Sequence, residues 1–392
     1  MITLKVKKDR TGPITGRHPW LFSGALYGVP EGIEPGTPVR LESPDEKYLA
    51  SGYFNSHSQI AVRIWGHDEH EEVDAEFFVR RIRRAFNIRK SLVENPGTDS
   101  FRVVNGENDL LPGLIVDMYA GYLAVQFHTR GIEHWRQEIS AALIEVIAPR
   151  GIYERSEAGS RRVEGLGSHA GILYGDVPDV VTIKENGFTF LIDIKGGQKT
   201  GFFLDQRDKR AAVVKYSSGR AVLNAFSYTG GFCVYALSGG AKSVVNVDTS
   251  KNALDMAREN IKINGLDPGR CEFVCEDVKK YIKDIKHGDF NLIVLDPPAF
   301  IKDRKKKNEG LVGYKKINDT AVSVLDSGGV LVTCSCSNHL SMGDFRYLLS
   351  ESGGKAGKTL QILESFTGSV DHPVLAANIE GDYLKVFFIR VV

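Results

Sequence analysis

The sequence predicts a multidomain α/β protein whose C-terminal half is a mostly parallel β-sheet with helices on both faces and an antiparallel last strand. The chain has 392 residues, which is too long for one ordinary hydrophobic core. From about residue 188 onward, apolar runs of strand length alternate with helical patterns, as in parallel sheets that are covered on both faces. Residues 383–392 form a further apolar run with no helix after it, and an antiparallel final strand fits this run.

Three domains are expected along the chain. Residues 1–68 contain short β-like runs separated by turn residues, which predicts a small β-rich domain. Residues 74–185 begin with a helical pattern and then alternate strands with one clear helix, which predicts a central α+β domain. Its expected strands are 101–104, 114–117 and 122–127, and its clear helix is 132–147. Residues 188–392 form the third domain.

The third domain is the most regular because its strands are near-continuous runs of Val, Ile and Leu. A helix is expected over residues 251–264, where the pair Asn264-Gly265 is typical of a helix C-terminus. The expected strands are 221–225, 243–247, 272–275, 292–295 and 330–333.

Composition restricts the partners of the protein. Fifty basic residues oppose 49 acidic ones, so the formal charge is only +1 and any nucleic-acid binding must come from local basic patches. No apolar run approaches the roughly 20 residues that span a membrane, and the N-terminus lacks the apolar region of a signal peptide. Five cysteines, three of them in core-like patterns, are typical of a reducing compartment. We therefore expect a cytoplasmic protein with no membrane partner.

The turn after the first strand of the third domain favours S-adenosylmethionine as cofactor. It contains glycines but lacks the G-x-G-x-x-G arrangement that lets the backbone approach a pyrophosphate, and S-adenosylmethionine has no phosphate. Asp248 ends the next strand, where a carboxylate can accept both ribose hydroxyls, and Asp277 is placed for the adenine amino group. A helix cap is the alternative for each acid. The candidate residues of the turn itself are Asn224, Phe226, Tyr228 and Gly230.

Two further strand ends carry the candidate chemistry. Asp296-Pro-Pro-Ala-Phe300 follows the fourth strand, and Cys334 and Cys336 follow the fifth. Carbon 5 of a pyrimidine is not nucleophilic until a thiolate adds to carbon 6, and a carboxyl group at nitrogen 3 stabilises the charge that develops there. One cysteine would be the nucleophile and Asp296 the nitrogen-3 partner. Side chains two apart in a strand share a face, so spacing does not choose between the cysteines.

These features also have purely structural interpretations. The prolines stiffen the Asp-Pro-Pro loop, which can be a rigid turn whose Phe300 packs on the core. A buried inert thiol is the usual state of cysteine, and it fits Cys233, Cys271 and Cys275 well. No metal site is predicted.

Three groups of basic residues are candidate RNA contacts. One group follows the Asp-Pro-Pro loop directly and suits contact with phosphates beside a target base, with a solvated face as the alternative. Such groups would anchor RNA without reading its sequence while the target base flips into the active site. The three groups are Lys302, Arg304, Lys305, Lys306 and Lys307; Arg80, Arg81, Arg83 and Arg84; and Arg161 and Arg162.

Several segments resemble the family of ribosomal large-subunit methyltransferase I, whose members are 5-methylcytosine RNA methyltransferases that use S-adenosylmethionine. The resemblance rests on residues 196–207 (GGQKTGFFLDQR), which are the most specific, and on 224–231 (NAFSYTGG), 296–300 (DPPAF) and 335–337 (SCS). Residues 17–24 resemble the opening of the family's N-terminal PUA domain, an RNA-binding module, and add Arg17 to the candidate RNA contacts. Residues 105–114 and 371–374 resemble central and C-terminal segments, so the resemblance spans nearly the whole chain.

The resemblance implies a PUA domain at the N-terminus and a class I, Rossmann-like methyltransferase domain that binds S-adenosylmethionine at the C-terminus. It implies that Cys336 is the nucleophile. Better-studied cytosine RNA methyltransferases carry Pro-Cys where this chain has Pro297-Pro298, so either another base removes the carbon-5 proton or Cys334 helps. The residues that would border the cofactor are Gln198, Thr200, Phe202, Asp205 and Arg207, together with Asp296.

Three functions stay open at the level of sequence. The leading prediction is methylation of carbon 5 of a cytosine in large-subunit ribosomal RNA through a covalent cysteine adduct. Methylation of an amino group would use the Asp-Pro-Pro loop to position the amine and would not need Cys336. The third possible function is that of an RNA-binding protein with an inactive methyltransferase fold. This function would give no role to Asp248, Asp277, Asp296 and Cys336. Assembly as a homodimer is left open.

Overall fold

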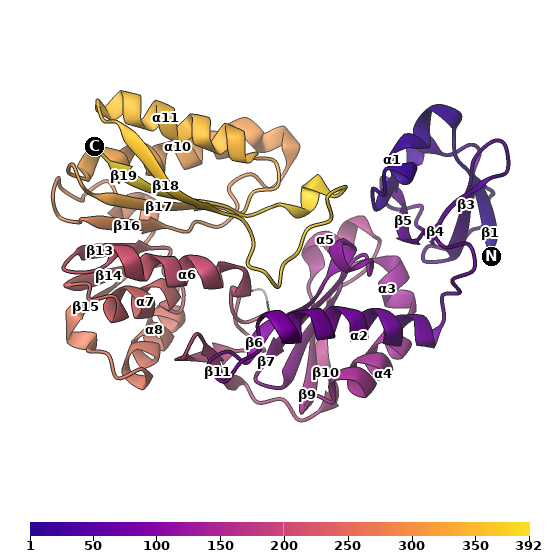
Figure 1. Ribbon diagram of the computed structural model, residues 1–392, viewed down its shortest axis with the longest axis horizontal. Helices are drawn as coiled ribbons and strands as arrows, with labels where there is room; N and C mark the ends of the chain where they lie inside the picture. The colour runs from indigo at the N-terminus through magenta and orange to yellow at the C-terminus, as the bar shows by residue number, and fades with distance from the viewer. Residues whose placement is uncertain (199) are drawn as a thin grey trace. The chain divides into compact units, whose positions relative to one another are not determined.

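Stretches of chain that are distant in sequence assemble into two units in this computed structural model, which describes residues 1–198 and 200–392 (Figure 1). The first unit comprises Met1–Ile183, Ile192–Leu204 and Val370–Gly381. The second comprises Lys184–Leu191, Asp205–Ser369 and Asp382–Val392. Because the chain passes between the units several times, the domain boundaries expected from the sequence stay a prediction. None of the described helices is long and apolar enough to cross a bilayer.

The N-terminal part of the first unit is a five-stranded sheet in the order β1-β3-β4-β5-β2. Only β1 and β3 pair in parallel, and the other neighbours are antiparallel. Alternate side chains of its strands point into the core: in β3, Val39 and Leu41 are fully buried while their neighbours are half-buried. The elements are β1 (Ile2–Lys5), α1 (Gly12–Thr15), β2 (Trp20–Phe22), β3 (Pro38–Glu42), β4 (Tyr48–Phe54) and β5 (Ile60–Gly66).

The central part of the first unit is a second five-stranded sheet, in the order β10-β9-β8-β7-β6, with one parallel pair, β8 and β9. Helix α2 begins at Asp74, whose side chain accepts a hydrogen bond from Phe77 N, and its buried residues share a core with the sheet. The helix expected over 132–147 is two helices that meet at Trp135. The elements are α2 (Ala75–Leu92), β6 (Ser100–Asn105), β7 (Leu114–Tyr119), β8 (Tyr122–Phe127), α3 (Arg130–His134), α4 (Arg136–Ile147), β9 (Gly151–Ser156), α5 (Ala158–Val163) and β10 (His169–Gly175).

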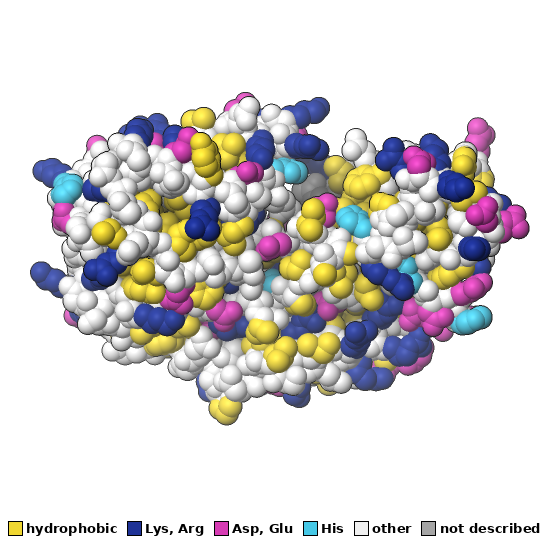
Figure 2. Space-filling view, turned by 45° about the horizontal axis from the view of Figure 1, so that its top comes forward, with side chains coloured by type: hydrophobic (Ala, Val, Ile, Leu, Met, Phe, Trp, Pro, Cys, Tyr) yellow, Lys and Arg dark blue, Asp and Glu magenta, His cyan; other side chains and the backbone are white. Residues whose placement is uncertain are grey.

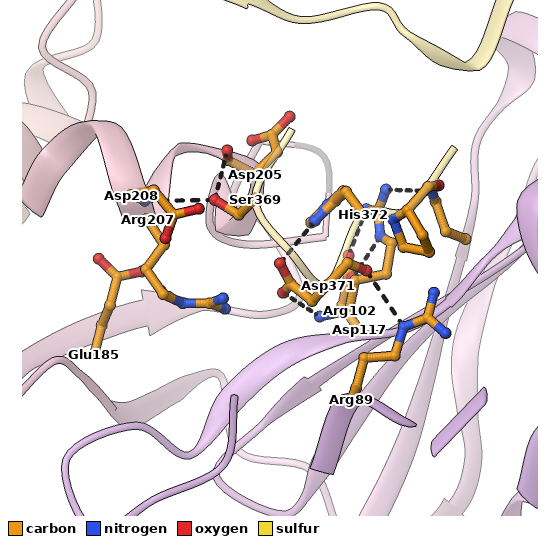
Figure 3. A network of polar contacts seen from close by, with 12 residues as sticks. Arg89, Arg102, Asp117, Glu185, Asp205, Arg207, Asp208, Ser369, Asp371 and His372 are labelled. Atoms are coloured by element: carbon orange, nitrogen blue, oxygen red, sulfur yellow. Dashed lines mark hydrogen bonds and ion pairs between the residues drawn. The ribbon is translucent and has the colours of Figure 1, made fainter. Parts of the chain in front are cut away.

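Buried hydrogen bonds attach the later segments of the first unit to its central part. Asp371 Oδ2 accepts a hydrogen bond from Arg102 N at 3.0 Å, and Arg89 Nε donates to the Asp371 carbonyl at 3.3 Å (Figure 3). The Arg102 side chain binds both oxygens of Asp117, which is 1% exposed. Asp117 in turn accepts a hydrogen bond from Thr200 at 2.6 Å. Residues 192–204 and 370–381 therefore belong to the first unit through buried polar contacts.

Strands β11 (Val180–Glu185) and β12 (Phe188–Asp193) form a two-stranded sheet. The second unit is built on a seven-stranded sheet in the order β15-β14-β13-β16-β17-β19-β18. The first five strands are parallel, and β19 runs antiparallel to both of its neighbours. This confirms the predicted parallel sheet with an antiparallel last strand. The strands are β13 (Ala221–Ala225), β14 (Ser243–Asp248), β15 (Cys271–Cys275), β16 (Leu292–Leu295), β17 (Val330–Ser335), β18 (Leu360–Phe366) and β19 (Lys385–Val391).

Helices cover both faces of this sheet (Figure 1). Residues of α9, α10 and α11, among them Val278, Ile317 and Phe345, share one core with the strands, and α6, α7 and α8 lie on the opposite face. The sequence analysis missed β18 because this edge strand is largely exposed and mixes polar with apolar residues. The helices are α6 (Arg207–Val213), α7 (Gly231–Ser238), α8 (Lys251–Ile263), α9 (Val278–Tyr281), α10 (Lys307–Val324) and α11 (Met342–Ala356).

Candidate active site

The strand order reverses beside β13, which has β14 on one side and β16 on the other. Ligands of open α/β sheets bind beyond the carboxyl ends of the strands at such a point. The turn that follows β13 is strained, since Phe226 (φ 61°) and Tyr228 (φ 46°) adopt the left-handed conformation that bulky residues avoid. Such strain costs on the order of 1–3 kcal/mol per residue and concentrates at functional sites.

Asp248 holds this turn in place. Its Oδ2 accepts a hydrogen bond from Tyr228 N and its Oδ1 accepts one from Ser250 N, both at 2.9 Å. The N-cap of α8 is Ser250, so the helix-cap alternative does not describe Asp248. Each oxygen of the carboxylate keeps a second lone pair, which a ligand hydroxyl can use.

Asp277 has different surroundings. It is the N-cap of α9, and its Oδ1 accepts a hydrogen bond from Lys279 N at 2.8 Å. The helix-cap alternative therefore describes its geometry correctly. Its carboxylate is exposed, and a contact with adenine stays a prediction.

The turn also contains buried polar atoms that suit a hydroxyl- or amine-bearing ligand. Among the described residues, Ser227 Oγ and Thr229 Oγ1 have no hydrogen-bond partner although both are buried. Asn224 is already bonded to the next strand, with Nδ2 at 2.9 Å from Asn246 Oδ1. Gly230 is a glycine for packing reasons, because a Cβ there would lie 2.8 Å from Ala257 Cβ. A carboxylate beside open hydroxyls fits S-adenosylmethionine better than a phosphate-bearing cofactor, whose negative charge Asp248 would repel.

The segment 196–207 contributes to both units. Gln198, which is exposed, Thr200 and Phe202 lie in the first unit, whereas Asp205 and Arg207 lie in the second. Thr200 Oγ1 and Phe202 N are both hydrogen-bonded to the Tyr119 hydroxyl, at 2.9 and 3.2 Å. These hydrogen bonds join both residues to Tyr119 of the central sheet, which the sequence did not indicate.

In the second unit, Asp205 connects three segments of chain. Its Oδ2 accepts a hydrogen bond from the Tyr383 hydroxyl at 2.5 Å. Its carbonyl oxygen accepts one from Lys209 Nζ at 2.6 Å and one from Ser369 Oγ at 3.0 Å (Figure 3). Burial lowers the pKa of Lys209, whose side chain is fully enclosed.

A buried ion pair missed at the sequence level orders the same unit. Arg210 binds both carboxylate oxygens of Glu185, at 2.7 and 2.6 Å, and the Tyr235 hydroxyl donates a third hydrogen bond at 3.1 Å. Arg207 Nε lies 3.9 Å from the same carboxylate. No sequence pattern marks Glu185, because its partners lie on helices that only the tertiary fold brings to it.

The two candidate thiols have different environments. Cys334 lies within β17 and is 1% exposed, and burial together with the charge of Asp296 raises the pKa of its thiol well above the usual value. Cys336 lies one residue beyond the end of β17, is half-buried, and has its Sγ 3.9 Å from the Pro297 carbonyl oxygen. The strand ends between the two cysteines, so the rule that alternate residues share a face does not extend to Cys336.

Gln206 orients the carboxylate of Asp296. Its Nε2 donates a hydrogen bond to Asp296 Oδ1 at 2.9 Å, and its side chain is 3% exposed. Sequence reasoning named both neighbours of Gln206 but not this residue. Gln206 could have been named from the sequence, because it lies within residues 196–207, the segment that most specifically resembles the family.

Tyr314 connects the Asp-Pro-Pro loop to the loop that carries Cys336. Its hydroxyl lies 2.9 Å from Ser337 Oγ, which also accepts a hydrogen bond from Ile301 N at 3.1 Å. The ring of Phe300 packs 4.8 Å from the ring of Tyr314. Helix α10 approaches this loop closely, since a Cβ at Gly310 would lie 2.8 Å from the Phe300 carbonyl oxygen. The loops that carry Asp296 and Cys336 are therefore packed against the same residue, Tyr314.

The candidate RNA contacts are mostly exposed. Lys302, Arg304, Lys305 and Lys306 lie at the surface before α10, and Arg17, Arg80 and Arg84 are also exposed. The expectation that Arg161 contributes to a basic face is wrong, because its buried guanidinium binds Glu133 and the carbonyl of Phe127. On the face shown in Figure 2, basic and acidic side chains are interspersed, which agrees with the net charge of +1.

One cysteine interpretation is also wrong. Cys233 is buried, with its Sγ 3.6 Å from that of Cys271, which is half-buried. Cys275 is exposed rather than buried, because β15 is the edge strand of the sheet.

Comparisons with known proteins agree with this architecture. A family described as S-adenosylmethionine-dependent methyltransferases matches residues 164–381, and one described as a PUA-like domain matches residues 4–66. A ribosomal RNA large subunit methyltransferase I from Aeromonas hydrophila is 43% identical, covering 98% of this chain and 98% of its own length. One from Klebsiella pneumoniae is 40% identical, covering 99% of this chain and 98% of its own.

The fold alone is also shared with a solved structure from Streptococcus mutans, described as a SAM-dependent methyltransferase, with a TM-score of 0.86, 24% identity and 100% of both chains covered. A methyltransferase solved in complex with SAH has the same TM-score and identity. The chain is thus an S-adenosylmethionine-dependent methyltransferase with an N-terminal PUA-like domain. It is 43% and 40% identical to these two relatives over nearly its full length, which shows that it belongs to the ribosomal RNA large subunit methyltransferase I family. The predicted family, fold class and cofactor are confirmed.

Proposed function

We propose that this protein methylates carbon 5 of a cytosine in large-subunit ribosomal RNA, and that Cys336 bonds covalently to the base during transfer. The substrate is supported by the relatives, whose names describe methyltransferases of large-subunit ribosomal RNA, and by the PUA-like domain. The chemistry is supported by one observation above the others. Cys336 is the half-buried thiol beside the Asp-Pro-Pro loop, whereas Cys334 is enclosed in the sheet.

In this proposal the Cys336 thiolate adds to carbon 6, so that a sulfur–carbon bond forms and the electron pair of the ring double bond makes carbon 5 nucleophilic. The carboxyl group of Asp296, oriented by Gln206, donates a proton to nitrogen 3 and so neutralises the negative charge that develops on the ring; nitrogen 3 gives this proton up again when the sulfur–carbon bond breaks. S-adenosylmethionine supplies the methyl group that carbon 5 takes up. A base then removes the carbon-5 proton, the sulfur–carbon bond breaks, and its electron pair returns to Cys336.

The base that removes this proton is proposed to be a group other than Cys334. Burial raises the pKa of the Cys334 thiol, so this side chain is protonated at neutral pH and does not accept a proton. Cys334 therefore does not take the place of the cysteine that related enzymes carry where this chain has Pro298.

RNA is proposed to reach this site by contacts between phosphates and exposed basic side chains. Those next to the Asp-Pro-Pro loop are closest in sequence to the proposed catalytic residues. Such contacts position the RNA without selecting its sequence. The residues are Lys302, Arg304, Lys305 and Lys306, with Arg17, Arg80 and Arg84 in the first unit.

Release of tritium from carbon 5 tests this proposal directly. Undermethylated large-subunit ribosomal RNA would carry tritium at carbon 5 of its cytosines, and methyl transfer would be followed in the same sample. We expect one tritium to be released for each methyl group transferred, because carbon 5 loses its hydrogen when it gains the methyl group. S-adenosylhomocysteine in place of S-adenosylmethionine is the control for release without transfer.

Other outcomes have distinct meanings. Methyl transfer with all tritium retained would rule out carbon 5 and favour methylation of an amino group. No transfer to any part of large-subunit RNA would reject the substrate, and nucleoside analysis of the product would identify the methylated base.

Asp248 is proposed to bind the cofactor, and Asp248→Ala is expected to weaken it. The variant loses a charged acceptor of hydroxyl hydrogen bonds and the anchor of Tyr228 N, which together predict roughly 10- to 100-fold weaker binding. Calorimetric titration with S-adenosylhomocysteine measures this change. Asp255→Ala, which removes an exposed carboxylate of α8, is the charge-matched control and should leave the affinity unchanged. Equal affinities for the two variants would remove Asp248 from the cofactor site.

A further inference from the structure

Lys385 fixes the chain on both sides of Cys336. It is the first residue of β19, and its backbone pairs with that of Ser335, the residue before Cys336. Its Nζ donates hydrogen bonds to the carbonyl oxygens of Ser337, the residue after Cys336, and of Tyr383, both at 2.8 Å. The side chain is 2% exposed. The half-buried thiol thus lies between two points that a single lysine holds.

The charge of this lysine is not neutralised by a carboxylate in contact. Among the described residues, no ion pair joins Lys385 to an acid, and its hydrogen-bond acceptors are neutral carbonyl groups. Burial lowers the pKa of Lys385 to about 8, and Asp382 and Cys336 are the groups whose negative charge opposes this change. A thiolate at Cys336 would supply the missing counter-charge.

We propose that Lys385 is a positioning residue for Cys336, holding its loop through the Ser337 carbonyl and stabilising the thiolate form of its side chain. This inference rests on the proposed function, in which Cys336 is the nucleophile. The thiolate rather than the thiol attacks carbon 6, and a neighbouring cation is a common way to keep a cysteine in that form. No pattern in the sequence indicates this role, because Lys385 lies 48 residues after Ser337.

Other ionisable groups near Cys336 must be counted with Lys385. Tyr314 of α10 is buried, and its pKa is raised, chiefly by burial, with Cys336 contributing. Asp296, directly after β16, is a potential negative charge, whereas Cys334, on β17, is a buried thiol whose pKa is raised by burial and by Asp296. Lys209 of α6 acts on Cys334. Of these groups, Lys385 is the cation on which Cys336 acts electrostatically, after Asp382.

The pH dependence of Cys336 alkylation tests the inference without RNA or cofactor. The full-length protein would be treated with iodoacetamide over a pH series, and mass spectrometry of the Cys336 peptide would give the midpoint of its reactivity. We expect the wild-type midpoint to lie below the value of about 8.5 for a free cysteine. Lys385→Gln keeps hydrogen-bond donors but removes the charge, and it should raise the midpoint by about one pH unit or more. Lys385→Arg keeps the charge and should restore most of the wild-type value.

Lys358→Met is the matched control. Lys358 Nζ also binds backbone carbonyls, those of Val322, Ser323 and Leu325, in the same unit but without contact to Cys336. This variant should lose a comparable set of hydrogen bonds and leave the Cys336 midpoint unchanged.

Two results would overturn the inference. The first is a wild-type midpoint at or above that of free cysteine, which needs no variant and holds even if Lys385→Gln fails to fold. The second is a shift of equal size in Lys358→Met, which would indicate general loosening rather than a lost charge. Methyl transfer that persists in Cys336→Ala would instead reject the proposed nucleophile and leave the alkylation result standing.

Discussion

Cys336→Ala is expected to lower methyl transfer by about 10³-fold or more, since the variant lacks the atom that adds to carbon 6. Cys334→Ala should stay within about tenfold of wild type, because it removes a buried thiol that is protonated at neutral pH and at most disturbs packing. Initial rates of methyl transfer to large-subunit ribosomal RNA measure both effects. The two variants form a matched pair, because the same atom is deleted two residues apart.

A trapping experiment separates a covalent role from a structural one. RNA that contains 5-fluorocytosine cannot lose the substituent at carbon 5, so the adduct between protein and RNA should persist and migrate slowly on a denaturing gel. Wild type and Cys334→Ala should form this adduct, and Cys336→Ala should not. If the pattern is reversed, Cys334 is the nucleophile, and if no variant forms an adduct, the covalent mechanism is wrong.

Arg210→Met is expected to destabilise the second unit by about 3–5 kcal/mol, because it leaves the Glu185 carboxylate buried without its guanidinium partner. Both side chains are almost fully enclosed, at 3% and 1% exposure. All three tryptophans, Trp20, Trp65 and Trp135, lie in the first unit, so their fluorescence does not report this change. Hydrogen exchange of peptides from β13 and β16, measured by mass spectrometry, reports the stability of the second unit.

Two further variants make this prediction specific. Lys262→Met breaks the exposed pair of Lys262 and Glu259 and should cost no more than about 0.5 kcal/mol. The double variant Glu185→Leu with Arg210→Met removes both charges and should be more stable than Arg210→Met alone. If the double variant is no more stable, the loss comes from packing rather than from an unpaired charge. Unchanged tryptophan fluorescence would show that the first unit stays folded.

The regular elements of the second unit were predictable because their signal is local. Near-continuous runs of Val, Ile and Leu mark β13, β14, β16 and β17, since strands buried on both faces need apolar side chains at most positions. The same reasoning missed β18, whose outer position in the sheet removes this requirement. It also merged α3 with α4, because the break at Trp135 leaves the helical pattern intact.

The candidate site was predictable only as a set of residue types at strand ends. Asp248 ends β14 and Asp296 follows β16, and topology alone requires the carboxyl ends of these parallel strands to lie at one edge of the sheet. Their partners were not predictable. Gln206 lies 90 residues from Asp296 in sequence, and no periodicity relates residues so far apart.

By itself, the sequence determined the family, the parallel sheet with its antiparallel last strand, the cofactor and the short list of acids and thiols, because each depends on local pattern or on motif resemblance. Only the tertiary structure showed that Cys334 is buried and Cys336 half-buried, divided residues 196–207 between two units, buried Arg161 and brought Lys385 to the Ser337 carbonyl. The physical reason is that burial and hydrogen bonding depend on which distant segments pack together. Pairing β17 with β19 is what encloses one thiol and leaves the next beyond the strand end, beside a buried cation.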